Sequence, residues 1–176
     1  MKEEIQVRIS EEELIAKIKE IAQQINEDYV GKKVHLVCIL SGSVFFTCEL
    51  AKSITVPVTM DFMRVSSYGE GMDSTGTISI DQDLNMSIEG RHVLVVEDIV
   101  DSGRTLALLS NILKKRDPAS LRLCSLLDKP SRRVTPVSID YLGFEIEDYF
   151  VVGFGLDYAQ KYRNLPFIGV VEFVDE

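Results

Sequence analysis

Three carboxylates lie close together in the middle of the chain, next to a turn that could bind a phosphate. Glu97 and Asp98 follow an apolar run over residues 93–96, and Asp101 begins the turn Asp-Ser-Gly-Arg-Thr. A glycine turn that opens a helix directs free backbone amides and the positive end of the helix dipole at one point. The serine and threonine hydroxyls of the turn add two further donors, so the stretch predicts an anion site.

The carboxylates restrict what that anion can be. Acidic groups beside a phosphate are electrostatically unfavourable unless they bind another part of the same ligand, and ribose hydroxyls and Mg²⁺ are suitable partners. We therefore predict a sugar phosphate, with Glu97 and Asp98 on the ribose hydroxyls and the turn on the phosphate. An acidic helix cap without a ligand is the alternative. Neither Gly-x-x-x-x-Gly-Lys-Ser/Thr nor a helix-opening Gly-x-Gly-x-x-Gly occurs in the chain.

Strands and helices alternate along the chain, which is typical of an α/β fold with a mostly parallel twisted sheet. Ligands of such sheets bind at the carboxyl ends of the strands, where the central turn lies. A capping box at Ser10 begins an amphipathic helix. The predicted strands are residues 34–40, 58–65, 93–96, 121–127 and about 168–174, with 77–80 as a hairpin arm, and the predicted helices are residues 10–31, 44–50 and 106–116.

The whole chain has the composition of a single α/β domain. It has 176 residues, 45% hydrophobic and 27% charged, and a net charge of −9, which argues against affinity for nucleic acids or anionic membranes. No apolar run spans a bilayer, and the charged start lacks the apolar core of a signal peptide, so we expect a cytoplasmic protein. The three cysteines are expected to be reduced core thiols, and His35 and His92 to have structural roles.

Several segments resemble a known enzyme family. The run Glu-Asp-Ile-Val-Asp-Ser-Gly-Arg-Thr after an apolar strand resembles the phosphoribosyl pyrophosphate signature of type I phosphoribosyltransferases. Leu-Leu-Asp-Lys-Pro-Ser-Arg-Arg, and Gly-Phe-x-Ile-x-Asp-x-Phe-Val-Val-Gly-x-Gly-x-Asp-Tyr-Ala-Gln-x-Tyr-Arg, resemble the bacterial hypoxanthine (6-oxopurine) members. The resemblance covers almost the whole chain from about Val34. It implies a core over about residues 30–135, a flexible lid hairpin over about 66–77, and a small hood from about 136–176 with the N-terminus.

The resemblance also implies a role for each matching residue. Asp101 would be the catalytic base toward purine N7, and Phe150 would stack on the purine. The family has a lysine where this chain has Ser41, so only backbone contacts with pyrophosphate are expected there. The implied contacts are Glu97, Asp98, Ile99, Val100, Asp101, Ser102, Gly103, Arg104 and Thr105 for phosphoribose; Lys129, Phe150, Val151 and Asp157 for the purine; Ser41, Gly42 and Arg163 for pyrophosphate; Ser67 and Tyr68 for the lid; and Asp157, Glu97 and Asp98 for Mg²⁺.

The implied reaction is purine salvage. Hypoxanthine, with guanine as a second base, would react with phosphoribosyl pyrophosphate to give the nucleotide and pyrophosphate. The expected partners are these small molecules and a second or further copies of the chain in a homodimer or homotetramer, with neither nucleic acid nor membrane. A nucleotide-sensing regulator on the same fold, and an enzyme for another base such as xanthine, remain as alternatives.

Overall fold

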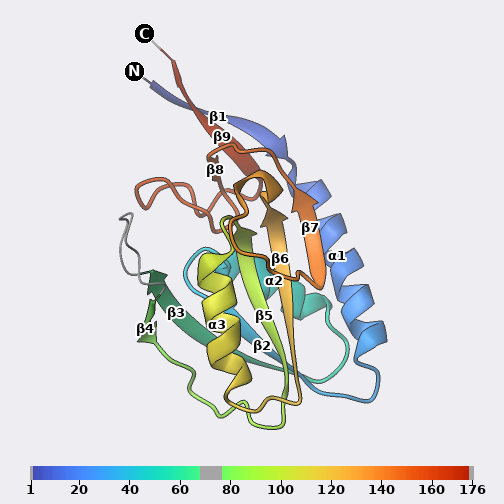
Figure 1. Ribbon diagram of the computed structural model, residues 1–176. Coiled ribbons are helices and arrows are strands. Elements are labelled where there is room, and N and C mark those ends of the chain that lie inside the picture. Colours follow the sequence, from blue (N-terminus) through green and yellow to red (C-terminus); the bar gives the residue numbers. More distant parts are fainter. Residues whose placement is uncertain (1, 68–76, 175–176) are drawn as a thin grey trace.

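A six-stranded sheet forms the centre of the computed structural model, which describes residues 2–67 and 77–174 (Figure 1). The strand order is β4-β3-β2-β5-β6-β7. β4 pairs antiparallel with β3, and all other neighbours pair in parallel. The strands are β2 (Val34–Ile39), β3 (Val58–Ser67), β4 (Ile78–Gln82), β5 (His92–Val100), β6 (Ser120–Asp128) and β7 (Tyr141–Glu145).

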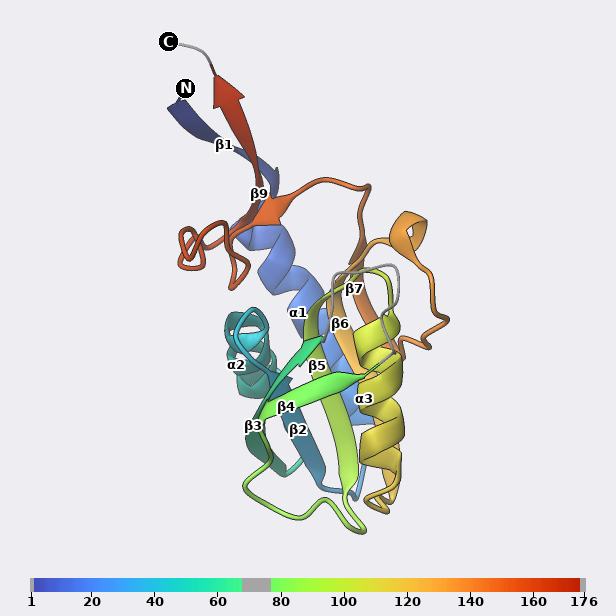
Figure 2. The same ribbon diagram turned by 60° about the vertical axis from the view of Figure 1, so that its left-hand side comes forward.

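Helices cover both faces of this sheet, as the apolar strands require. α1 (Glu11–Asp28) and α2 (Val44–Ser53) pack on one face, and α3 (Arg104–Lys114) packs on the other (Figure 2). Successive residues of β5 alternate between the two cores: Leu94 belongs to the core under α1 and α2, and Val95 to the core under α3. A strand buried on both faces has no polar side, which explains the unbroken apolar run.

A second sheet of three antiparallel strands lies beyond the carboxyl ends of the first. Its order is β1-β9-β8, with β1 (Lys2–Ile9), β8 (Val151–Val152) and β9 (Ile168–Val174). The arrowheads of β5, β6 and β7 point toward it (Figure 1). Strand β1 was not predicted, although Ile5, Val7 and Ile9 alternate with polar residues. Its partner β9 lies far along the chain, 166 residues away at the Gln6–Glu172 bond.

The capping box predicted for the first helix is confirmed. The Glu13 amide donates to the Ser10 hydroxyl at 3.2 Å, and the Ser10 amide donates to the Glu13 carboxylate at 2.8 Å. The buried face of α1 includes Leu14, Ile18 and Ile25, as the periodicity predicts. In the part of the chain that the structure describes, no helix is long and apolar enough to cross a membrane.

Some element boundaries differ from the sequence prediction. β5 continues through Glu97 to Val100, because those residues still pair with β6, so the carboxylates lie within the strand and not at its end. β3 also runs two residues further than predicted, and Ser67, expected in the lid, pairs with Ile78. Tyr68 and the rest of the predicted lid up to residue 76 lie outside the described residues. Cys38 and Cys124 are buried free thiols, but Cys48 is exposed on α2.

Candidate active site

The turn between β5 and α3 has the geometry of an anion site. Gly103 is the N-cap of α3, with a φ of 80° and no side chain of its own, and the Ser102 hydroxyl accepts from the Arg104 amide at 3.4 Å. The Ser102 carbonyl accepts from the amides of Val134 and Thr135 at 2.9 and 3.0 Å, which holds the turn from outside. A Cβ on Gly103 would lie 2.4 Å from the Thr135 carbonyl oxygen, so only glycine fits here. The uncapped amides of the first helical turn are therefore available to a phosphate.

Glu97 and Asp98 form a buried pair of carboxyl groups on β5. Burial, together with the charge of Asp98, raises the pKa of Glu97 well above its ordinary value. Burial also raises the pKa of Asp98, although the Ile99 amide at 2.7 Å and the charge of Arg163 act in the opposite direction. Two acidic groups that are costly to ionise side by side favour a ligand that brings positive charge or hydroxyl donors.

Three segments that are distant in sequence touch at Gly42. A Cβ on Gly42 would lie 1.7 Å from a carboxylate oxygen of Asp98, so the turn after β2 rests directly against that side chain. A Cβ on Gly155 would lie 2.0 Å from the carbonyl oxygen of Gly42. The peptide bond between Leu40 and Ser41 is cis. The structure thus brings together the predicted pyrophosphate turn, a predicted phosphoribose residue and the C-terminal loop.

Replacing Gly155 with alanine should therefore lower the free energy of unfolding by more than the cost of a positive φ alone, because the added Cβ also clashes with Gly42. Gly155 has a φ of 102°, which by itself costs alanine about 1–2 kcal/mol. Gly31→Ala is the matched control, because Gly31 has a φ of 74° and no atom lies within 4 Å of the position that its Cβ would take. We expect urea unfolding to show a larger loss for Gly155→Ala. Equal losses would mean that the approach to Gly42 contributes nothing.

Arg163 and Asp157 face each other in the loop between β8 and β9. The Arg163 guanidinium donates to the Gly155 carbonyl at 2.7 Å and lies 3.1 Å from the Asp157 carboxylate. The other Asp157 oxygen accepts from the Gln160 amide at 2.9 Å. Gln160 and Tyr162 have φ values of 66° and 76°, and such strained backbone is most often retained where function needs it. Asp157 and Arg163 are thus held in place by local bonds.

The N-terminal strand anchors this loop. Glu3 on β1 accepts from the Lys161 ammonium at 2.9 Å and from the Tyr162 hydroxyl. The bond from Tyr162 and the bond from Lys161 lower the pKa of Glu3. Residues near the start of the chain therefore position the loop that carries Arg163.

A second group of charged residues lies where β5 and β6 end. Lys129 is buried, with its amide donating to the Val100 carbonyl at 3.0 Å and its ammonium 3.5 Å from Asp148. Arg132 lies 3.6 Å from the other oxygen of Asp148 and 3.5 Å from the Asp101 carboxylate. Lys129, Asp148, Arg132 and Asp101 thus form a row of alternating charge, which we call the charge row.

The carboxylate of Asp101 is not used to hold the turn. Its side chain is 49% exposed, and among the described residues no backbone amide donates to it. The main-chain carbonyl of Asp101 instead accepts from Arg133 at 3.1 Å. The carboxylate is therefore accessible to solvent, with the ion pair to Arg132 as its contact in the charge row.

The predicted aromatic contact follows the charge row closely along the chain, because Phe150 is two residues after Asp148. Phe150 directly precedes β8 and is 59% exposed, and its ring packs edge to face on Tyr158 at 5.7 Å. Val151 pairs with Val170 of β9. An exposed aromatic face can stack on a planar base. The predicted purine residues are therefore contributed by both sheets.

Sequence reasoning assigned no role to Arg132, Asp148 and Gly155. All three lie inside the segments that carry the family resemblance, but only their contacts distinguish them from their neighbours. An arginine shortly after a lysine-proline pair, or a glycine between two apolar residues, has no pattern of its own. Within residues 2–67 and 77–174, no group of three acidic, histidine or cysteine side chains forms a ready metal site.

Comparison with known proteins agrees with this geometry. A family model described as a phosphoribosyl transferase domain matches residues 8–159. The chain therefore belongs to the phosphoribosyltransferase family, and the predicted type I fold is confirmed. Its relatives include the hypoxanthine phosphoribosyltransferase of Salmonella typhimurium, 48% identical over the full length of both chains. The hypoxanthine-guanine phosphoribosyltransferase of Streptococcus thermophilus is 46% identical over 94% of this chain and 92% of its own.

A solved structure confirms the likeness in three dimensions. A hypoxanthine-guanine phosphoribosyltransferase from Bacillus anthracis, crystallised with a HEPES molecule in its active site, superposes with a TM-score of 0.92. It is 45% identical, and the match covers 96% of this chain and all of that one. Sequence, fold and site thus agree on one family.

Proposed function

We propose that this chain transfers the 5-phosphoribosyl group from phosphoribosyl pyrophosphate to hypoxanthine, and also to guanine, as an enzyme of purine salvage. The main support is that the phosphate turn, the buried carboxyl pair and the Gly42 turn lie together at the carboxyl ends of the central strands. The full-length relatives named for hypoxanthine transfer support the base. No observation favours a regulator or an enzyme for another base over this function.

The phosphoribosyl group would lie across the carboxyl ends of the strands. The turn from Asp101 to Thr105 would hold the 5′-phosphate, with Ile99 and Val100 leading into it. Glu97 and Asp98 would meet the ribose hydroxyls. Displacement at the anomeric carbon develops positive charge on the sugar, and buried carboxylates nearby stabilise such a transition state.

The leaving pyrophosphate needs donors and positive charge. The amides of Ser41 and Gly42 and the guanidinium of Arg163 would supply these, and Arg163 would exchange its Asp157 contact for the ligand. Glu97, Asp98 and Asp157 offer hard oxygen ligands suited to Mg²⁺ shared with the substrate. When bound, Mg²⁺ would offset the charge of the leaving group. That these residues hold the metal is part of the proposal.

The purine would lie between the charge row and Phe150. Phe150 would stack on the base, and the backbone at Val151 would meet its edge. Lys129 would donate to the exocyclic oxygen of hypoxanthine, because a buried ammonium has few other partners. Asp101 would take the proton from N7 or return it, depending on the direction of reaction.

A panel of bases tests the proposal directly. Pyrophosphate release is measured with phosphoribosyl pyrophosphate, Mg²⁺ and hypoxanthine, guanine, xanthine, adenine or uracil. We expect hypoxanthine and guanine to be turned over most efficiently. Release with none of the bases would leave a nucleotide-sensing regulator, and preference for xanthine or adenine would move the assignment within the family. A homodimer or homotetramer and a cytoplasmic location remain predictions.

Replacing Glu97 should reveal a conflict between stability and function. The raised pKa means that the folded chain binds a proton more tightly than the unfolded chain, so stability falls as pH rises above the ordinary value of 4.5. Glu97→Gln should flatten that fall in urea unfolding between about pH 5 and 8, yet weaken phosphoribosyl pyrophosphate binding. Glu89→Gln, on an exposed residue, is the control. An unchanged pH dependence in Glu97→Gln would contradict the prediction.

A further inference from the structure

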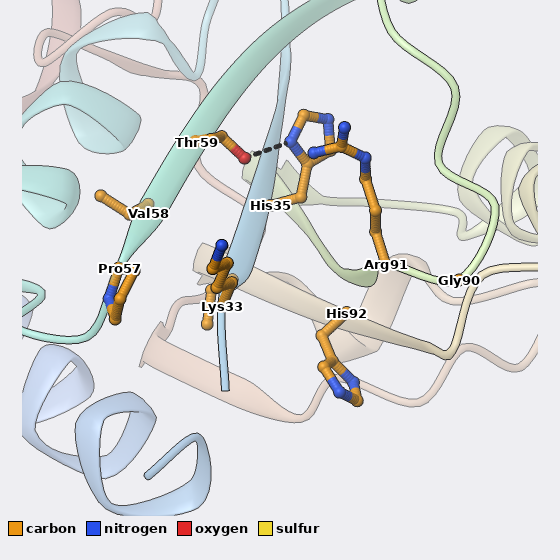
Figure 3. A pocket seen from close by; sticks show the side chains of 9 residues that line it. Lys33, His35, Pro57, Val58, Thr59, Gly90, Arg91 and His92 are labelled. Atoms are coloured by element: carbon orange, nitrogen blue, oxygen red, sulfur yellow. Dashed lines mark hydrogen bonds between the residues drawn. The ribbon is translucent and has the colours of Figure 1, made fainter. Parts of the chain in front are cut away.

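A second cavity lies at the opposite end of the sheet from the candidate active site. It has a volume of about 550 Å³ and opens where β2, β3 and β5 begin (Figure 3). Parallel strands place their amino ends together, so this cavity shares no residue with the phosphate turn or the charge row. Its polar lining includes Lys33, His35, Thr59 and Arg91.

His35 is the buried polar group of this cavity. It is 2% exposed, and its Nδ1 lies 2.7 Å from the Thr59 hydroxyl. Its Nε2 is buried and has no hydrogen-bond partner in the described part of the chain. Buried polar atoms are nearly always paired, so an orphan nitrogen beside a cavity indicates a missing partner. If the Thr59 hydroxyl donates to Nδ1, Nε2 carries the proton and is a donor.

The charged groups of the cavity are both cations. Arg91 directly precedes β5, Lys33 directly precedes β2, and both line the cavity together with His35 (Figure 3). Neither forms an ion pair among the described residues, although the chain has a net charge of −9. Burial first, and then the charge of Arg91, lower the pKa of His35, which keeps its ring neutral. Two unpaired cations facing one cavity in an acidic protein favour an anion.

We propose that this cavity binds a phosphate group, either as inorganic phosphate or as a small phosphate monoester. The planar guanidinium of Arg91 offers paired donors to phosphate oxygens, and Lys33 adds charge from the other side. Arg91 and the unpaired Nε2 of His35 belong to the same cavity, so a phosphate that binds the guanidinium there would also offer Nε2 its missing acceptor (Figure 3). The inference rests on the cavity alone and does not depend on the proposed enzyme function.

The two histidines of the chain make the test specific. Their ring resonances are followed by NMR in the whole protein, during titration with inorganic phosphate, with glycerol 3-phosphate, and with sodium chloride at equal ionic strength. We expect a saturable shift of the His35 signals with phosphate. His92 also lines the cavity, but its Nδ1 is bonded to the Ser120 hydroxyl at 2.7 Å, so its signals should shift less than those of His35. The ligand that saturates at the lower concentration identifies the free or the esterified form.

Matched charge variants decide between binding and general salt effects. Arg91→Gln should weaken the His35 response roughly tenfold or more, because a charge-assisted contact is lost. Lys32→Gln removes the same charge from an exposed residue just outside the cavity and should change little. A His35 response no larger than that to chloride, or one equal in Arg91→Gln and Lys32→Gln, would overturn the proposal and leave a solvent-filled cavity.

Discussion

Asp101→Asn is expected to fold and to bind nucleotide as the parent does, while its chemical step slows by roughly 10²–10⁴-fold, the usual contribution of general acid–base catalysis. Asparagine has nearly the same shape as aspartate but cannot accept a proton at neutral pH. The structure sharpens the distinction, because the carboxylate holds no amide of the turn in the described part of the chain. If the role of Asp101 were purely structural, the substitution should therefore have little effect on the rate.

Single-turnover measurement is needed, since product release can hide a slower chemical step in steady state. Asp117→Asn is a suitable control, because Asp117 is exposed and has a φ of 55°, which asparagine tolerates. The ion pair with Arg132 is also lost in the variant, and the free energy of unfolding measures that effect separately. A variant that binds nucleotide and reacts at the parental rate would remove Asp101 from the catalytic role.

Lys129→Gln should lower kcat/KM for hypoxanthine. The expected loss of transition-state stabilisation is about 1.5–3 kcal/mol, the range for hydrogen bonds to charged groups. This corresponds to roughly a 10- to 150-fold loss. Adenine lacks the oxygen that the ammonium would contact, so its slow reaction should be affected less. The measurement is the ratio of kcat/KM values for hypoxanthine and adenine in parent and variant.

The surroundings of Lys129 call for a control of their own. Its ammonium also contacts Asp148, so the variant leaves that carboxylate with only Arg132 among the described residues. Lys129 is buried, but Asp148 is half exposed, so water can solvate the carboxylate once the ammonium is removed and we expect only a small loss of stability. Lys115→Gln, at the exposed end of α3, removes the same charge far from the charge row. If hypoxanthine turnover is unchanged in Lys129→Gln, the lysine has no role in recognising the base.

The charge row connects Lys129 and Asp101, the two residues changed in these predictions. Arg132 lies between Asp101 and Asp148, so a change at Lys129 reaches Asp101 through the ion pairs of the row. Effects of residues in one network do not add. The double variant Lys129→Gln with Asp101→Asn should therefore lose less than the sum of the two single losses, expressed as free energies.

The sequence by itself determined five of the six strands of the main sheet, its helices and the location of the phosphate turn; β7 was not predicted. The predicted elements follow from local patterns: apolar runs for strands buried on both faces, the capping box at Ser10, and a glycine turn that opens α3. The family resemblance pointed to the same turn, and the family was confirmed by relatives over the full length. Local chemistry was sufficient because each of these elements is specified within a few residues.

Only the tertiary structure decided how the segments meet. Strand β1 forms because β9 pairs with it, and the extension of β5 past Glu97 depends on pairing with β6. The contact of Gly42 with Asp98 and Gly155, and the row from Lys129 to Asp101, join residues that are distant along the chain. Such contacts depend on distances between elements, and hydrophobic periodicity and motif spacing contain no information about those distances. For the same reason, only the packed structure shows that Nε2 of His35 is buried and has no hydrogen-bond partner among the described residues.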